Sequence, residues 1–201
     1  MHIKTVLNVG CGQRAISILG SSLPADGWRE LRLDIDPKVD PDIVASMTDM
    51  APVPDGSVDA VWSSHNLEHL DPHAVPVALQ EFLRVLKPGG TLLLTVPDLQ
   101  AVAKLVAEDR LDETLYDSRQ GPIRPLDVIY GYGPALAAGN RFMAHRNGFT
   151  PNLLGRLLQE AGFEPVAIWR RARAYELQVK AFRPPAPAEA LGELGLQFPA
   201  G

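Results

Sequence analysis

The sequence predicts a doubly wound α/β fold, a mostly parallel sheet with helices on both faces. Short apolar runs alternate with helical patterns along the chain. The runs are apolar at consecutive positions, which is typical of strands that are covered on both faces. The 201 residues, 46% of them apolar, are enough for one domain with a full hydrophobic core.

Seven short runs have the composition of strands, and turn residues bound most of them. The first ends at a Gly-Cys-Gly turn, the second at Asp36-Pro37, and the fifth follows a Pro-Gly-Gly sequence. The predicted strands are 4–9, 30–35, 42–45, 58–63, 91–96, 164–170 and 175–182.

Three helices fit between these runs, at 73–86, 98–108 and 150–161. Asp98 is a predicted N-cap. Thr150 is a second one, because a proline follows it at the first helical position, and Gly162 is the expected stop. Glycine and proline interrupt residues 13–29, so we expect only a short helix there.

Composition narrows the classes of function. The net charge is −5 and the pI is near 5.5, which disfavours nucleic acid as a partner, because phosphate binding needs a basic surface. A single cysteine excludes an internal disulfide and suits a reducing compartment. No apolar run is long enough for a signal peptide or a membrane span. We therefore expect a cytoplasmic protein that does not contact a membrane.

Glycines and carboxylates stand at the ends of the first strands. The turn Gly10-Cys11-Gly12 lets backbone N–H groups approach a ligand, although a tight βα turn alone would need the same residues. Asp34 ends the second strand, where a carboxylate can accept both hydroxyls of a ribose; the alternative is a solvated strand end. Asp34 is preferred to Asp36, which belongs to the turn with the following proline. Asp49 is placed to accept a hydrogen bond from an adenine amino group.

Six segments, in this order, resemble the class I S-adenosylmethionine-dependent methyltransferase superfamily. They are 7–12 (LNVGCG), 33–36 (LDID), 48–50 (TDM), 54–61 (PDGSVDAV), 67–70 (LEHL) and 81–92 (EFLRVLKPGGTL). The resemblance covers roughly residues 4–97 and continues to about 183. It implies a Rossmann-like, seven-stranded sheet with the last strand antiparallel, and a methyltransferase domain over residues 1–183.

The resemblance also implies S-adenosylmethionine as the cofactor. Gly10 and Gly12 would cradle its methionine part, Asp34 would hold its ribose, Asp49 and Met50 would contact its adenine, and Ser64 and His65 would face its sulfonium. The implied cofactor-contacting residues are Asn8, Gly10, Cys11, Gly12, Asp34, Ile35, Asp49, Met50, Ser64 and His65.

Two positions depart from the superfamily pattern. Asn8 replaces the usual acidic residue of the first strand, and Arg14 replaces a frequent third glycine. Both leave the contacts to the cofactor's amino-acid end open. The chain has no Gly-x-Gly-x-x-Gly sequence at this turn, which disfavours a nicotinamide-dependent dehydrogenase.

Residues 65–69 read HNLEH, which matches a zinc-protease pattern with two histidine ligands. That pattern requires a helix, whereas here it follows a strand. We expect a helix start, with Glu68 in its first turn, His69 packed under the cofactor and no metal. A divalent ion held by His65, Glu68 and His69 within a methyltransferase is the alternative. His65 is the first candidate for a general base.

Residues 111–150 are the expected cover of the acceptor site, a substrate lid inserted after the fifth strand. We expect Asp127, Tyr130 and His145 to line the acceptor pocket, with His145 as a second catalytic candidate. A surface Ω-loop or a dimer contact is the alternative. Residues 184–201 are rich in proline and alanine and are interpreted as a tail.

The acceptor is inferred by exclusion. The N/D-P-P-Y/F segment typical of DNA amino-methylation is absent after the fourth strand, and the lone cysteine stands in the cofactor loop. A small molecule remains, and no oligomeric state is indicated. Two other classes of function stay open. One is a catalytically inactive S-adenosylmethionine-binding or regulatory domain, and the other is a metal-dependent hydrolase that uses the HNLEH residues.

Overall fold

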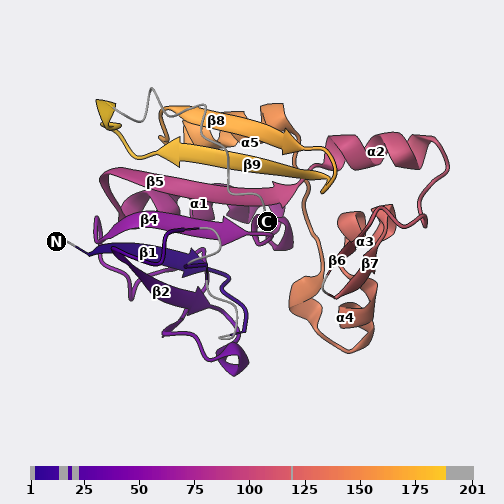
Figure 1. Ribbon diagram of the computed structural model, residues 1–201, viewed down its shortest axis with the longest axis horizontal. Coiled ribbons are helices and arrows are strands. Elements are labelled where there is room, and N and C mark those ends of the chain that lie inside the picture. The colour runs from indigo at the N-terminus through magenta and orange to yellow at the C-terminus, as the bar shows by residue number, and fades with distance from the viewer. Residues whose placement is uncertain (1–2, 14–17, 20–22, 119, 189–201) are drawn as a thin grey trace.

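The computed structural model of the protein describes residues 3–13, 18–19, 23–118 and 120–188. Its main feature is a seven-stranded sheet with the order β3-β2-β1-β4-β5-β9-β8 (Figure 1). These strands are β1 (Lys4–Val9), β2 (Trp28–Asp34), β3 (Ile43–Val44), β4 (Val58–Ser64), β5 (Leu86–Pro97), β8 (Val166–Arg171) and β9 (Glu176–Phe182).

The sheet has the predicted topology. The pairs β1–β2, β1–β4, β2–β3 and β4–β5 are parallel, whereas β9 runs antiparallel to both β5 and β8. The prediction of a mostly parallel sheet whose last strand is antiparallel is therefore confirmed. The strand order reverses between β1 and β4, and ligands of open α/β sheets bind outside the carboxyl ends at such a point.

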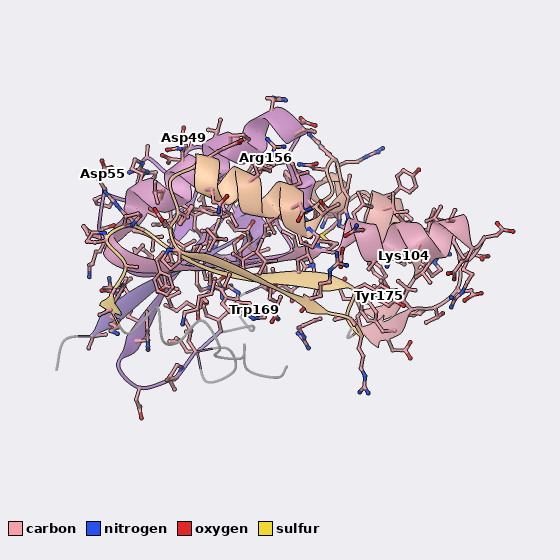
Figure 2. The ribbon with its side chains drawn as sticks, turned by 90° about the horizontal axis from the view of Figure 1, so that it is seen from above. Asp49, Asp55, Lys104, Arg156, Trp169 and Tyr175 are labelled. Atoms are coloured by element: carbon pink, nitrogen blue, oxygen red, sulfur yellow. The ribbon has the colours of Figure 1, made fainter. Side chains whose placement is uncertain are left out.

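Two helices cover one face of the sheet. Figure 2 shows α1 (Val75–Val85) and α5 (Pro151–Glu160) on the same side of it. Phe82 of α1 and Leu154 of α5 are fully buried in one core cluster with Leu7 and Leu94 of the sheet. Each such side chain contributes about 1.5–3 kcal/mol of hydrophobic stabilisation, so this layer holds the sheet in place.

The opposite face has a smaller core. Val6, Ile18 and Ala60 form a buried cluster that Trp28 and Trp62 flank. Side chains alternate along a strand, so Val6 of β1 points to this face and its neighbour in sequence to the other. No described α-helix contributes to the cluster. The short helix predicted within residues 13–29 falls largely outside the described residues, so the second helical layer stays a prediction.

Residues 111–150 form a compact addition at the carboxyl end of the sheet (Figure 1). It follows α2 (Leu99–Ala107) and contains the antiparallel pair β6 (Tyr116–Ser118) and β7 (Gly121–Ile123), then α3 (Pro125–Tyr130) and α4 (Gly133–Ala137). The sequence predicted the location of this segment but none of its elements.

The predicted helix caps are confirmed, and the helix boundaries differ from the prediction by one or two residues. Asp98 accepts a hydrogen bond from the N–H of Ala101 (3.2 Å), and Thr150 from that of Leu153 (3.3 Å). The helix predicted at 73–86 ends one residue early, because Leu86 already pairs with β4. The 3-10 turns are η1 (Pro37–Val39), η2 (Leu67–His69), η3 (Pro72–Ala74) and η4 (Arg141–Met143). None of the described helices combines the length and apolarity that a bilayer crossing requires.

Arg84 ties the loop before β4 to helix α1. Its Nη1 donates to the carbonyl oxygen of Val53 (2.9 Å) and its Nη2 to that of Met50 (3.0 Å). Glu81, one turn earlier on α1, accepts from Nε of Arg84 (2.6 Å) and from the N–H of Met50 (2.7 Å). The pairing with Arg84 lowers the pKa of Glu81. The spacing of Glu81 and Arg84 thus puts both groups on the helix face that meets this loop.

We predict that Arg84→Ala lowers the free energy of unfolding by about 2–3 kcal/mol, because it leaves the carbonyl groups of Val53 and Met50 without their donor. Arg156→Ala is the matched control, since Arg156 pairs only at the surface with Glu160 (3.2 Å) and should cost less than about 0.5 kcal/mol. Urea unfolding of both variants measures the difference. Equal losses would contradict the role assigned to Arg84.

Candidate active site

Gly10 stands where the loops after β1 and β4 meet. Its φ is +68°, and a Cβ at this position would lie 2.0 Å from Oδ1 of Asn66. Nδ2 of Asn66 donates to the carbonyl oxygens of Val9 (2.9 Å) and Ser64 (3.0 Å), so this side chain bridges the two strand ends. The close approach, in addition to the turn, requires glycine at position 10.

Asp34 holds the glycine loop through its carboxylate. Oδ2 accepts from the N–H of Gly12 (2.9 Å), and Oδ1 accepts from the N–H of Asp36 (3.0 Å). A carboxylate oxygen can accept two hydrogen bonds, so each oxygen of this half-buried side chain keeps one acceptor site. These two sites suit the two hydroxyls of a ribose, and the neighbouring Ile35 is 50% exposed beside them.

Asn8 and Cys11 face the protein interior. The buried amide of Asn8 donates to Oε1 of Glu30 (2.7 Å), which joins β1 to β2. Cys11 is buried too, and this burial raises the pKa of its thiol to about 11. The thiol therefore stays protonated at neutral pH and is a poor nucleophile.

The predicted adenine contacts have different outcomes. Asp49 is exposed, and its contact with adenine stays a prediction. Met50 is completely buried in the main core, and its N–H donates to Glu81. The structure corrects the expectation for Met50, because neither its side chain nor its N–H is open to a ligand.

A pocket of about 450 Å³ lies between the carboxyl end of the sheet and the added segment. His65 and Pro97 line it from the sheet, whereas Tyr116 and Tyr132 line it from residues 111–150. Tyr175, which also lines it, lies near the end of the sheet that carries α2 (Figure 2). The segment expected to cover an acceptor site thus supplies one wall of a pocket.

His65 follows β4 and lies between two carboxylates. Its Nε2 is 3.1 Å from Oε2 of Glu176, and its Nδ1 is 3.4 Å from Oε1 of Glu68. Burial opposes protonation, but the two carboxylates outweigh it and raise the pKa of His65 well above its usual range. A protonated imidazole cannot accept a proton. The expectation that His65 is a base with a near-neutral pKa is therefore corrected for this arrangement.

Glu68, His69 and His145 form a cluster in the wall of the same pocket. Their candidate ligand atoms, one from each residue, all lie within 4.8 Å of one another. The two imidazole rings meet edge to face, with centroids 4.9 Å apart. Burial lowers the pKa of His145, which favours its neutral form. For Glu68, burial opposes ionisation, but His65 outweighs it and lowers the pKa of the carboxyl group.

The three residues predicted to line the acceptor pocket also differ in outcome. Asp127 and His145 line it, whereas Tyr130 is not among the lining residues and is 62% exposed. The structure therefore corrects the assignment of Tyr130. The carboxylate of Asp127 accepts from the N–H groups of Arg124 (3.0 Å) and Gly133 (3.0 Å), so it caps α3 and orders the segment.

Residues 65–69 contain the expected helix start with Glu68 in its first turn, but the helix is short. Leu67–His69 is a single 3-10 turn, and His65 has a left-handed backbone with φ +56°. The two histidines of the HNLEH sequence are therefore not stacked on one helix face, as a zinc protease requires. The side chain of His69 meets His145 from the added segment instead.

Two residues of the site were not predicted from the sequence. Asn66 has no assigned role within the HNLEH sequence. Its position just after a strand is the signal that would have predicted a contact at the strand end. Glu176 is 111 residues from its partner His65, and only the antiparallel register of β9 against β5 brings them together.

Comparisons with known proteins agree with this geometry. A family model described as a methyltransferase domain matches residues 7–94. No curated protein matches the chain. A SAM-dependent methyltransferase from Methanosarcina mazei superposes with a TM-score of 0.59 at 19% identity, over 91% of this chain and 93% of that one. One from Archaeoglobus fulgidus gives 0.58 at 16%, over 89% and 86%.

A third solved structure contains ligands. The 1,6-didemethyltoxoflavin-N1-methyltransferase of Burkholderia thailandensis, with bound 1,6-didemethyltoxoflavin and S-adenosylhomocysteine, superposes with a TM-score of 0.55 at 18% identity. The superposition covers 89% of this chain and 70% of that one. At this identity the likeness shows the fold.

The strand order, with β9 reversed between β5 and β8, defines a Rossmann-like methyltransferase fold. The family match spans the first strand through β5 and includes the glycine loop, Asp34 and the sequence around Arg84. Residues 7–94 match the methyltransferase-domain family, and the described chain has the fold of the S-adenosylmethionine-dependent methyltransferases with which it superposes.

We predict that Gly10→Ala destabilises the protein more than Gly12→Ala. Both positions have positive φ, so alanine costs about 1–2 kcal/mol at either. Only Gly10 adds a clash with Asn66, since no described atom lies within 4 Å of a Cβ at Gly12. Urea unfolding measures both costs. In an Asn66→Ala background the extra cost at Gly10 should shrink, and an unchanged cost would contradict the steric explanation.

Cys11 gives a chemical test of the loop. Because burial raises the pKa of its thiol to about 11, the folded protein should react slowly with a disulfide reagent at pH 8. The reaction should become fast in urea, where the thiol returns to its ordinary pKa. Absorbance of the released thiolate follows both reactions, and fast labelling of the folded protein would show that the loop is open.

Proposed function

We propose that the protein transfers the methyl group of S-adenosylmethionine to a small-molecule acceptor, which binds in the pocket beneath residues 111–150. The main observation behind this proposal is that the glycine loop and the pocket lie next to each other where the strand order reverses. The glycine loop and Asp34 follow β1 and β2, and the pocket starts at His65, directly after β4.

The residues present fit the proposed cofactor. No described atom lies within 4 Å of a Cβ placed at Gly12, so this part of the loop is open, and Asp34 keeps one acceptor site on each carboxylate oxygen within the described part of the chain. When bound, S-adenosylmethionine supplies a methyl group on a positively charged sulfur that leaves readily. The Burkholderia neighbour binds the demethylated form of this cofactor, which supports the same use here.

The pocket suits a small acceptor. Its volume of about 450 Å³ falls within the range of about 300–1,000 Å³ that is usual for small-molecule sites. Aromatic side chains from the added segment, Tyr116 and Tyr132, can pack on an apolar or planar part of the molecule. The Burkholderia neighbour acts on 1,6-didemethyltoxoflavin, a small molecule, which supports this acceptor class.

The protein's own contribution to the transfer is positional. Holding the acceptor atom in line with the carbon–sulfur bond supplies much of the acceleration. The added segment supplies one wall of the pocket, which limits the access of water, a competing nucleophile. In the pocket wall the Nδ1 atoms of His69 and His145 both face backbone carbonyls, so their Nε2 atoms are the ones available to the acceptor side, whereas the two carboxylates beside His65 favour its protonated form.

We predict that the protein binds S-adenosylhomocysteine in the micromolar range, about −8 kcal/mol. Asp34→Asn should weaken binding by about tenfold or more, or about 1.4 kcal/mol, because it replaces a charged acceptor of the ribose hydroxyls. Asp36→Ala is the matched control, since this carboxylate caps η1 by accepting from Lys38 (2.9 Å). Calorimetry gives all three affinities.

The outcomes separate the alternatives. No binding to the wild-type protein would overturn the proposed function. A larger loss in Asp36→Ala than in Asp34→Asn would move the ribose contact to Asp36. Binding without methyl loss across a broad panel of acceptors would favour the inactive, cofactor-binding alternative.

A further inference from the structure

Glu68 is an ionisable group without hydrogen bonds in the interior. Its side chain is 1% exposed, and neither carboxylate oxygen accepts a hydrogen bond within the described part of the chain. His65 is its ion-pair partner at 3.4 Å, which is too long for a good hydrogen bond. Buried polar groups are nearly always hydrogen-bonded, and charged ones are paired or bind metals. The carboxylate of Glu68 therefore calls for a further cationic partner.

The two histidines beside Glu68 have their lone pairs arranged for such a partner. Nδ1 of His69 is 3.1 Å from the carbonyl oxygen of Ala144, and Nδ1 of His145 is 2.7 Å from that of Val128. A carbonyl only accepts hydrogen bonds, so each Nδ1 is the donor, and in a neutral ring the Nε2 atom keeps its lone pair. Metal-binding histidines are held in this way, with the second ring nitrogen donating to a carbonyl or a carboxylate.

The backbone fixes this arrangement. The N–H groups of Arg146 and Asn147 both donate to the carbonyl oxygen of Glu68 (2.8 and 3.1 Å), which ties the added segment to η2. Gly131 lets the chain pass closely, since a Cβ there would lie 2.0 Å from the carbonyl oxygen of Met143. His145 is thus held against Glu68 and His69 by contacts that do not depend on a ligand.

We propose that Glu68, His69 and His145 bind a divalent first-row transition-metal ion at the wall of the pocket. Their candidate ligand atoms lie within 4.8 Å of one another. Two ligands of one zinc ion lie at most about 4.2 Å apart, given bonds of about 2.0–2.1 Å. Binding of the ion would therefore draw these atoms closer together through side-chain rotation.

The donor set selects the class of ion. Two imidazole nitrogens and one carboxylate suit Zn²⁺, Fe²⁺ or Co²⁺, whereas Mg²⁺ prefers oxygen ligands alone. Three protein ligands leave at least one coordination position free, and the cluster lines the pocket. The site therefore has the composition of a metal centre that binds a further molecule, not of a closed structural site.

The location of the metal site in the pocket wall indicates a class of acceptor. This part of the inference rests on the proposed function. An acceptor hydroxyl bound to the ion would lose its proton to solvent more readily, because the ion stabilises the oxyanion. The oxygen then attacks the methyl carbon: the oxygen–carbon bond forms, the carbon–sulfur bond breaks, and S-adenosylhomocysteine leaves with the electron pair. We infer that the acceptor carries a metal-binding oxygen, and His145 serves as a ligand to the ion instead of a base.

The first test is metal binding to untagged full-length protein that has been dialysed against a chelator. We predict that calorimetry detects one equivalent of Zn²⁺ and no binding of Mg²⁺. His145→Ala and Glu68→Gln should each weaken Zn²⁺ binding by about 100-fold or more. His73→Ala is the matched control, because His73 is an exposed histidine of η3 and should leave the affinity unchanged. Circular dichroism and thermal melting show whether each variant is folded.

His145→Ala removes a ligand from the added segment and leaves the sheet unchanged. This variant therefore still tests the metal site if Glu68→Gln does not fold. Absence of Zn²⁺ binding, or equal binding in His145→Ala and His73→Ala, would overturn the metal site. S-adenosylhomocysteine is titrated into the metal-free protein separately. Binding of S-adenosylhomocysteine without Zn²⁺ binding would leave the proposed function standing and reject this inference alone.

Cobalt tests the free coordination position. Co²⁺ bound to the wild-type protein should give a visible absorption spectrum that is lost in His145→Ala. Acetohydroxamate, a small ligand that binds metals through oxygen, should change that spectrum if a position is free. An unchanged spectrum would show a closed site and overturn the inference that the ion binds the acceptor oxygen.

Discussion

The contact between Gly10 and Asn66 is the constraint on which the site depends. The strand order reverses between β1 and β4, and the loops after these strands meet at Gly10. Asn66 fills the gap at their base and donates to Val9, Ser63 and Ser64. The absence of a Cβ at Gly10 makes room for that side chain. This contact therefore fixes the glycine loop relative to His65, the neighbour of Asn66 that lines the pocket.

A second connection extends this frame to the added segment. Glu68 follows Asn66 by two residues, and its carbonyl oxygen receives the N–H groups of Arg146 and Asn147. The capping carboxylate of Asp127 orders α3, whose Val128 carbonyl in turn orients His145. Residues 111–150 are thus attached to the carboxyl end of the sheet. This attachment explains why a segment with little regular structure presents a histidine to the pocket.

The sheet was predicted well from the sequence. Each buried strand of a doubly wound fold appears there as a continuous apolar run that ends at turn residues. Asp98 and Thr150 were predicted as caps for the same reason, since a cap acts on residues three positions away. The environments of His65, Met50 and Tyr130 were predicted wrongly. Each depends on contacts with residues that are distant in sequence, such as Glu176 and Glu81, or on the path of a segment whose elements have no clear periodicity.

The charges around His65 show how the site can accommodate a metal ion. His65 has two carboxylate partners, and Glu176 alone holds it at 3.1 Å while also pairing with Arg171 (2.8 Å). Transfer of the Glu68 carboxylate to a metal ion therefore leaves His65 paired. The ion would in turn neutralise a buried carboxylate that accepts no hydrogen bond from any described residue. Because Glu176 remains paired with His65, Glu68 can bind a metal ion without leaving an unpaired charge elsewhere in the pocket.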